Sequence, residues 1–238
     1  MQAGYIPTRE ARFSAIGTLL AARMRPSFRF LDLGCGPGSL SGRLLERFPR
    51  SRSVAVDFDP VNLALGPVAW TRFRRRMTWV EADLRTAGWA TRLPRGRFDA
   101  VVSTTALHWL EPPRLRRVYA VARRLLRTGG LLLNGDSAPV ARPAGDLDAL
   151  LQAWKEGQRT EARRAGRPPE WGEWWGALSG EPSLRPLLAE RARRFPRASD
   201  HEHVLTEAEH LRILRSAGFR NAAVLWRDGP NVVLGASG

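Results

Sequence analysis

The sequence predicts an α/β fold in which a doubly wound, mostly parallel sheet carries helices on both faces. Three observations predict this fold: an apolar run that ends in closely spaced glycines, an alternation of strand-like and helix-like segments over 52–136, and two strand-like runs near the C-terminus. A chain of 238 residues, 43% of them hydrophobic, can bury one substantial core. We therefore expect one domain that carries an insertion.

The first expected element is an amphipathic helix over residues 8–24. Apolar residues recur there at helical spacing between arginines, and Pro26 ends the pattern. A strand over 28–33 should follow.

A glycine-rich loop comes directly after that strand, with glycines at 34, 36 and 38. Apolar residues then recur at helical spacing, and Ser39 or Ser41 can cap the new helix. A glycine has no Cβ, so a ligand can lie on the backbone, and the helix N-terminus offers N–H groups to it. The second strand ends at Asp57, where an acid can accept hydrogen bonds from both ribose hydroxyls. Together these features predict a nucleotide site.

Two common nucleotide motifs are missing from this loop. The dinucleotide fingerprint would need glycine in place of Ser39, and the P-loop ending Gly-Lys-Ser/Thr does not occur. The stretch Leu31-Asp-Leu-Gly-Cys-Gly-Pro-Gly38 instead resembles the first motif of class I S-adenosylmethionine-dependent methyltransferases. The resemblance continues through 98–110, 125–133 and 209–219, and covers roughly 28–136 and 204–236.

This resemblance implies a Rossmann-like fold with a seven-stranded, mostly parallel sheet, completed by an antiparallel C-terminal hairpin. It implies an N-terminal helix in 1–27 that covers the cofactor, a cofactor-binding core over 28–136 with a Gly129-Gly130 turn before the fifth strand, a helical substrate lid over 137–203, and a last helix and hairpin over 204–238. The implied cofactor is S-adenosyl-L-methionine, with S-adenosyl-L-homocysteine as product.

Within the family pattern, Asp57 would bind ribose, Phe58 would pack on adenine, and Asp83 would face the adenine amino group. The full set of expected cofactor-binding residues is Asp32, Gly34, Cys35, Gly36, Gly38, Asp57, Phe58, Asp83, Leu84, Ser103 and Thr104.

The segment 137–200 is rich in proline and is expected to hold a helix near 146–165. Trp171, Trp174 and Trp175 share one helical face, and either form a small satellite core or line an aromatic wall over the substrate. The candidate substrate-binding residues are Tyr5, His108, Trp109, Trp171, Trp174, Trp175 and His203. The alternatives are that Tyr5 belongs to a frayed N-terminus and that His203 lies on the surface.

The C-terminal part predicts a helix and a hairpin. Thr206 and Glu209 form a capping-box pattern, and Ala217-Gly218 ends the helix. Asp228-Gly229-Pro230 joins the runs 220–226 and 231–234.

His108, just past the fourth strand, is the candidate catalytic residue. Its near-neutral pKa would suit a general base, which matters only for acceptors that lose a proton. A contact to cofactor or substrate and a structural role remain as alternatives. The Asn/Asp-Pro-Pro-aromatic motif of amino-methylating enzymes is absent, and Cys35 belongs to the cofactor loop instead of serving as a pyrimidine nucleophile. We expect O-, N- or C-methylation of a small, partly apolar or aromatic acceptor.

The net charge of +15 opens a second possibility. The basic residues are almost all arginine, with Lys155 the sole lysine, as a high-GC coding bias would give. They form either a solvated surface or a nucleic-acid face, so a tRNA or rRNA methyltransferase is the alternative enzyme, and a non-catalytic S-adenosylmethionine-binding protein is the alternative of another class. One cysteine, no metal-ligand pattern and no apolar run of membrane-spanning length favour a cytoplasmic protein without a metal or a membrane partner. The sequence does not identify the oligomeric state, and either a monomer or a homodimer is expected.

Overall fold

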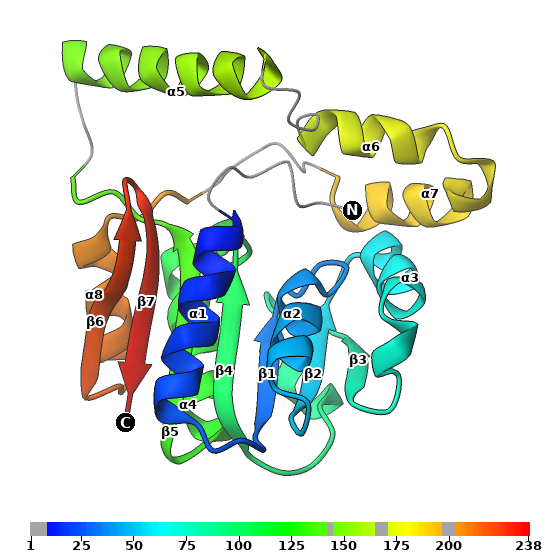
Figure 1. The fold of residues 1–238 in the computed structure, drawn as a ribbon, viewed down its shortest axis with the longest axis vertical. Helices are drawn as coiled ribbons and strands as arrows, with labels where there is room; N and C mark the ends of the chain where they lie inside the picture. The colour runs from blue at the N-terminus through cyan, green and yellow to red at the C-terminus, as the bar shows by residue number, and fades with distance from the viewer. Residues whose placement is uncertain (1–8, 142–144, 165–170, 197–202) are drawn as a thin grey trace.

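The computed structural model describes residues 9–141, 145–164, 171–196 and 203–238. Its centre is a seven-stranded sheet in the order β3-β2-β1-β4-β5-β7-β6. The strands are β1 (Arg29–Leu33), β2 (Arg52–Asp57), β3 (Met77–Glu81), β4 (Phe98–Thr104), β5 (Leu126–Ser137), β6 (Asn221–Asp228) and β7 (Asn231–Ser237). The first five pair in parallel, and β7 runs antiparallel to both β5 and β6. This topology confirms the predicted fold class (Figure 1).

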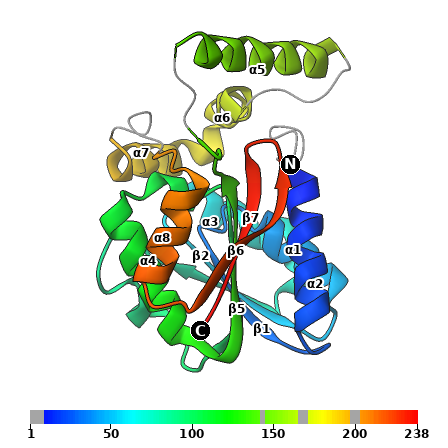
Figure 2. The same ribbon diagram turned by 90° about the vertical axis from the view of Figure 1, so that its left-hand side faces the viewer.

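Helices cover both faces of the sheet, as Figure 2 shows. On one face lie α1 (Arg9–Arg23) and α2 (Ser39–Arg47), and on the other lie α4 (Pro112–Leu125) and α8 (Glu207–Ser216). Side chains along each strand alternate between these two layers. Phe30 of β1 packs into the core with α1 and α2, whereas Leu31 and Leu33 of the same strand pack into the core with α4 and α8. The helix α3 (Pro60–Ala69) follows β2 and lies against β3.

Two local expectations are wrong. No serine side chain caps α2; its N-cap is Gly38, whose φ of 79° lies in the left-handed region, and the Ser41 hydroxyl bonds to Asp32 instead. Gly129 and Gly130 do not form a turn ahead of the fifth strand, because β5 begins at Leu126, directly after α4. The glycines instead fall where the pairing of β4 and β5 shifts register between Phe98 and Ala100.

Other local signals are confirmed. Thr206 and Glu209 make both hydrogen bonds of a capping box at the start of α8. Gly218, with φ of 95°, follows the end of that helix, and β6 and β7 form the expected hairpin.

Above the sheet lie α5 (Asp146–Arg164), α6 (Trp171–Ser179), the short η4 (Pro182–Leu184) and α7 (Arg185–Arg194). The predicted helix near 146–165 is confirmed by α5, which lies farthest from the sheet in Figure 1. The helix α7 instead comes down onto α3. Among the described residues, no helix has both the length and the apolar character needed to cross a membrane.

Candidate functional site

The carboxyl ends of β1, β2, β3, β4 and β5 meet at the upper edge of the sheet, where ligands bind in open α/β sheets. The loop after β1 is left-handed at Gly34, Gly36 and Gly38. A Cβ on Gly34 would lie 2.5 Å from the Cβ of Ala106, and one on Gly38 would lie 2.5 Å from the ring of Trp79. A Cβ on Gly36 would meet nothing within 4 Å. Gly36 is thus the point where bare backbone faces open space.

Asp57, at the end of β2, holds this loop. One carboxylate oxygen accepts from the N–H of Gly36 at 2.7 Å, and the other accepts from the N–H groups of Phe58 and Asp59, each at 2.8 Å. Burial raises the pKa of Asp57, and the three amides oppose that rise. A carboxylate offers about four acceptor positions. Three are filled by the backbone, so Asp57 has room for about one ligand hydroxyl instead of the two expected.

Asp32 lies beneath the loop and is fully buried. It accepts a 2.7 Å hydrogen bond from the Ser41 hydroxyl, which lies 2.8 Å from the hydroxyl of Ser53. Burial raises the pKa of Asp32 to about 7. These contacts join β1, α2 and β2, so Asp32 supports the loop from below.

Cys35 is also buried, and burial raises the pKa of its thiol. Its N–H donates to the Val56 carbonyl at 2.9 Å, which ties the loop to β2. A thiol with a raised pKa is a poor nucleophile.

The residues expected at the adenine end lie together, but arginines cover them. Arg85 forks onto both oxygens of Asp83, with Nε and Nη2 each 2.8 Å from an oxygen. The guanidinium carbons of Arg85 and Arg194 lie 5.3 and 4.7 Å from the ring centroid of Phe58. Leu84 packs against the core that includes α4 and α8.

The helix α7 contacts the rim of this site, formed by the residues at the ends of β2 and β3. Arg194 donates to the Phe58 carbonyl at 2.9 Å and to Glu81 at 2.7 Å, and Arg191 donates to Asp59 at 2.7 Å. The guanidinium of Arg191 also lies 3.8 Å from the ring centroid of Trp175. Three hydrogen bonds thus join α7 to the ends of β2 and β3.

The end of β4 contributes Ser103 and Thr104 differently from expectation. The Ser103 hydroxyl is buried and donates to the Leu33 carbonyl at 2.7 Å, so it ties β4 to β1. Thr104 is half-buried, and its hydroxyl lies 3.3 Å from that of Thr105. Thr105 has a φ of 53°, the one positive value for a non-glycine in the described part of the chain. Strained backbone of this kind gathers at functional sites.

A histidine–aspartate pair lies at the same edge of the sheet, near the ends of β4 and β5. His108 lies in the short helix η3 (Leu107–Trp109), and its Nδ1 is 2.8 Å from an oxygen of Asp136 near the end of β5. The exposed fractions of the two side chains are 11% and 2%. Burial alone would raise the pKa of Asp136, but His108, together with the charge of Arg12, holds it below its ordinary value. Asp136 is therefore a carboxylate at neutral pH.

Arg12 and His210 complete this buried polar cluster. Arg12 reaches from α1 toward the Gly135 carbonyl at 3.5 Å, and only 2% of it is exposed. His210 of α8 is fully buried, which lowers its pKa. Sequence reasoning missed both residues and Asp136. Asp136 carried a usable signal, because it ends an apolar strand as Asp57 does.

Several candidate substrate residues stay predictions. Tyr5 lies outside the described residues, as do the side chains of Trp171 and Trp174, although their backbone belongs to α6. Trp109 is 47% exposed beside His108, with ring centroids 5.0 Å apart, and the N–H of His203 donates to the His108 carbonyl at 2.8 Å. Within the described residues, no group of three His, Cys, Asp or Glu side chains is placed to hold a metal ion.

Comparison with known proteins shows which proteins this chain resembles. Residues 30–130 match the model of a family described as a methyltransferase domain. An uncharacterized methyltransferase of Mycobacterium tuberculosis is 38% identical over 111 residues, which cover 46% of this chain and 48% of that protein. The ubiquinone/menaquinone biosynthesis C-methyltransferase UbiE of Rhizobium rhizogenes is 28% identical over 204 residues, 84% of this chain and 70% of that protein.

Solved structures share the fold. The CurJ carbon methyltransferase superposes with a TM-score of 0.64 at 14% identity, over 99% of this chain and 56% of that one. The chain spans about half the length of the first curated relatives that it matches.

Proposed function

Because the chain belongs to the class I S-adenosylmethionine-dependent methyltransferases, we propose that it transfers a methyl group from S-adenosyl-L-methionine to a small, partly apolar or aromatic acceptor. The observation that carries this proposal is the loop at Gly36, open on its ligand side and fixed by Asp57. The pair His108–Asp136 lies at the same edge of the sheet.

The residues present fit the cofactor. Gly36 would bring bare backbone against its amino acid part, in a loop whose left-handed shape depends also on Gly34 and Gly38. The remaining acceptor position of Asp57 would take a ribose hydroxyl. When bound, the cofactor supplies a sulfonium-activated methyl group. At the adenine end the side chains must rearrange, because Arg85 must share Asp83 with the adenine or move away from it.

His108 and Asp136 provide a means of removing a proton from the acceptor. Asp136 is ionised, so it favours the tautomer of His108 that carries its proton on Nδ1, and the lone pair then lies on Nε2. We assign His108 as the general base for acceptors that lose a proton and Asp136 as the residue that positions it. Because the acceptor must be aligned with the departing methyl group, a fixed imidazole also contributes orientation.

The charges around the candidate site favour a small acceptor over RNA. The arginines described at its rim, Arg85, Arg191 and Arg194, are each paired with a carboxylate of the chain. Their charge is largely neutralised where an RNA acceptor would have to enter. The relative whose name describes C-methylation in quinone biosynthesis supports an apolar ring as acceptor.

A methyl-transfer screen tests the proposal. The purified chain is incubated with methyl-labelled S-adenosyl-L-methionine and two separate pools, one of small phenols, quinols and carboxylic acids, the other of tRNA and rRNA. We expect label in the small-molecule pool. Label only in the nucleic-acid pool would contradict the acceptor class, and none in either pool would favour the non-catalytic alternative.

The role of His108 is tested on the acceptor found in that screen. His108→Ala should lower turnover by about 10²-fold or more on an acceptor that loses a proton, while the affinity for S-adenosylhomocysteine stays unchanged. A fall in that affinity instead would identify His108 as a cofactor contact.

A further inference from the structure

The edge of the sheet opposite the candidate cofactor site carries a row of arginines. Six strands, β1 to β6, start at this edge. Five of the segments that lead into them are rich in arginine and poor in acid, namely 23–29, 47–52, 70–76, 92–99 and 123–127, and the sixth, 216–221, carries Arg220 alone. Asp99 is the one acidic side chain within these segments, and Glu46, directly before 47–52, forms an ion pair with Arg72. The exposed arginines of these segments are Arg23, Arg25, Arg47, Arg50, Arg52, Arg72, Arg74, Arg75, Arg92, Arg95, Arg97, Arg123, Arg124, Arg127 and Arg220. We call this surface the basic edge.

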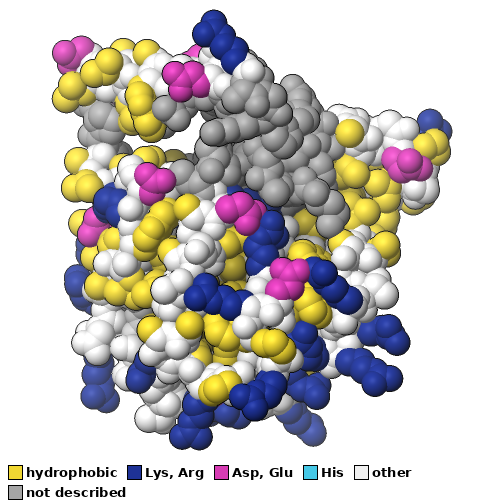
Figure 3. Space-filling view, viewed as in Figure 1, with side chains coloured by type: hydrophobic (Ala, Val, Ile, Leu, Met, Phe, Trp, Pro, Cys, Tyr) yellow, Lys and Arg dark blue, Asp and Glu magenta, His cyan; other side chains and the backbone are white. Residues whose placement is uncertain are grey.

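The charge is unevenly distributed between the two ends of the strands. Acidic residues lie at or just beyond the carboxyl ends, namely Asp57, Asp59, Glu81, Asp83 and Asp136. Figure 3 shows dark blue side chains gathered along the lower end of the molecule and magenta ones higher up. The topology produces this gathering, because parallel strands bring loops distant in sequence to one edge.

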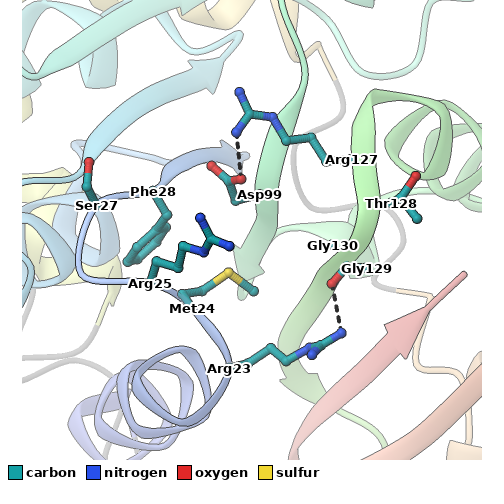
Figure 4. Close-up of a pocket in the computed structure, with 10 residues that line it drawn as sticks. All are labelled: Arg23, Met24, Arg25, Ser27, Phe28, Asp99, Arg127, Thr128, Gly129 and Gly130. Atoms are coloured by element: carbon teal, nitrogen blue, oxygen red, sulfur yellow. Dashed lines mark hydrogen bonds and ion pairs between the residues drawn. The ribbon is translucent and has the colours of Figure 1, made fainter.

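A pocket of about 500 Å³ lies in the basic edge, between the end of α1 and the start of β5. Arg23, Arg25 and Arg127 line it, with Asp99 as the one acid, so its lining carries an excess of positive charge (Figure 4). Arg127 donates to Asp99 at 2.9 Å, and Arg23 donates to the Gly129 carbonyl at 3.1 Å. Asp99 thus offsets the charge of Arg127, whereas Arg23, held by a carbonyl, and the exposed Arg25 give the pocket its excess of positive charge, an arrangement suited to a phosphate group.

The length of the row indicates a polymer. Strands lie about 4.8 Å apart, so the span from β3 to β6 across the seven-stranded order is about 30 Å. That length matches about nine base pairs of a duplex at about 3.4 Å each. A small phosphorylated molecule would need the pocket alone.

The surface is polar enough to favour nucleic acid over a lipid membrane. The large exposed hydrophobic side chains of the described residues are Val68, Trp109, Val140, Leu147, Leu150, Trp154, Val204 and Leu225, and none belongs to the basic edge. A membrane-binding face would present apolar side chains among its cations. Arginine, in contrast, forks well onto phosphate oxygens.

We propose that the basic edge docks the phosphate backbone of a nucleic acid. This binding is separate from methyl transfer, because the candidate cofactor site lies at the other end of the strands and the arginines around it are paired. The nucleic acid would hold the protein in place without serving as the methyl acceptor. The inference does not depend on the proposed function.

Fluorescence anisotropy with labelled tRNA and with a labelled 20-base-pair duplex tests the proposal over 50–200 mM NaCl. With about five phosphates contacted, affinity for the duplex should fall by about 500-fold across this range. The triple variant Arg25→Gln, Arg74→Gln, Arg95→Gln removes arginines for which the described part of the chain shows no side-chain hydrogen bond. It should weaken binding at least about tenfold and make the salt dependence shallower.

The matched control is Arg116→Gln, Arg117→Gln, Arg212→Gln, which removes the same charge from exposed positions of α4 and α8. It should keep most of the wild-type affinity, and both triples should keep the circular dichroism spectrum and the affinity for S-adenosylhomocysteine. Four results would overturn the proposal: no binding at 50 mM NaCl, equal losses in the two triples, tighter binding to vesicles of phosphatidylcholine with 20% phosphatidylserine, or a loss caused entirely by Arg25→Gln. The last would reduce the surface to a single phosphate pocket.

Discussion

Replacing Asp57 with asparagine separates the two tasks that we assign to this carboxylate. Asp57 accepts three backbone N–H groups, at 2.7, 2.8 and 2.8 Å, from Gly36, Phe58 and Asp59. Asparagine has one carbonyl oxygen, which can keep the pair from Phe58 and Asp59. Its NH₂ group would then face the N–H of Gly36, so one charge-assisted hydrogen bond is lost and two donors oppose each other.

A hydrogen bond to a charged group contributes about 1.5–3 kcal/mol. Burial raises the pKa of Asp57, so the neutral amide recovers part of that loss. We expect Asp57→Asn to lower the free energy of unfolding by about 2 kcal/mol, measured by urea denaturation. Affinity for S-adenosylhomocysteine, measured by calorimetry, should fall by at least about tenfold, because the loop loosens and the ribose acceptor is weakened.

Asp99→Asn is the matched control. Asp99 accepts a backbone N–H from Arg29 at 2.7 Å and a guanidinium from Arg127 at 2.9 Å, but at the opposite edge of the sheet. Its substitution should lower stability without changing cofactor affinity. Unchanged affinity in Asp57→Asn, or equal losses of affinity in the two variants, would refute the reasoning.

Three further substitutions test separate parts of the site. Gly36→Ala places a methyl group in the open ligand space at a φ of 55°, so calorimetry should show S-adenosylhomocysteine binding lost by about 100-fold or more at a stability cost of about 1–2 kcal/mol, whereas Gly88→Ala, at a φ of −95°, should bind normally. In Asp32→Asn the pH dependence of stability should flatten. The pKa of Asp32 in the folded protein, about 7, lies above the ordinary 3.8, so the wild type loses up to about 4 kcal/mol of stability as pH rises through that window. Urea denaturation at pH 4 and pH 8 that gives the same change in the free energy of unfolding for both proteins would contradict this. Asp136→Asn should lower turnover about tenfold or more and shift the pH–rate profile while cofactor affinity stays the same; an unaltered profile would remove the positioning role.

The sheet and most helices could be predicted because their signals are local. Apolar periodicity, the glycine loop, Asp57 at a strand end and the Thr206–Glu209 capping box each lie within a few residues. The prediction of a turn at Gly129-Gly130 was wrong because pairing with β4 extends β5 back to Leu126. Local glycine content did not outweigh the hydrogen bonds of the sheet.

The parts of the site that were not predicted depend on contacts between distant segments. His108 meets Asp136, which is 28 residues away in the sequence, and Arg191 of α7 meets Asp59 across 132 residues. The pair Arg85–Asp83 is the exception, because its residues are only two apart, yet the sequence did not predict it, since the same two side chains can also face solvent separately. Hydrophobic periodicity places strands and helices, but it does not determine which charged side chains meet at their ends.

The most direct test of the central claim is calorimetric titration of the purified chain with S-adenosylhomocysteine and S-adenosylmethionine, with NAD as the control ligand. We predict micromolar binding of the first two and none of NAD, because the loop lacks the third glycine of the dinucleotide fingerprint. Binding of NAD, or failure of both S-adenosyl compounds to bind the folded chain, would contradict the account.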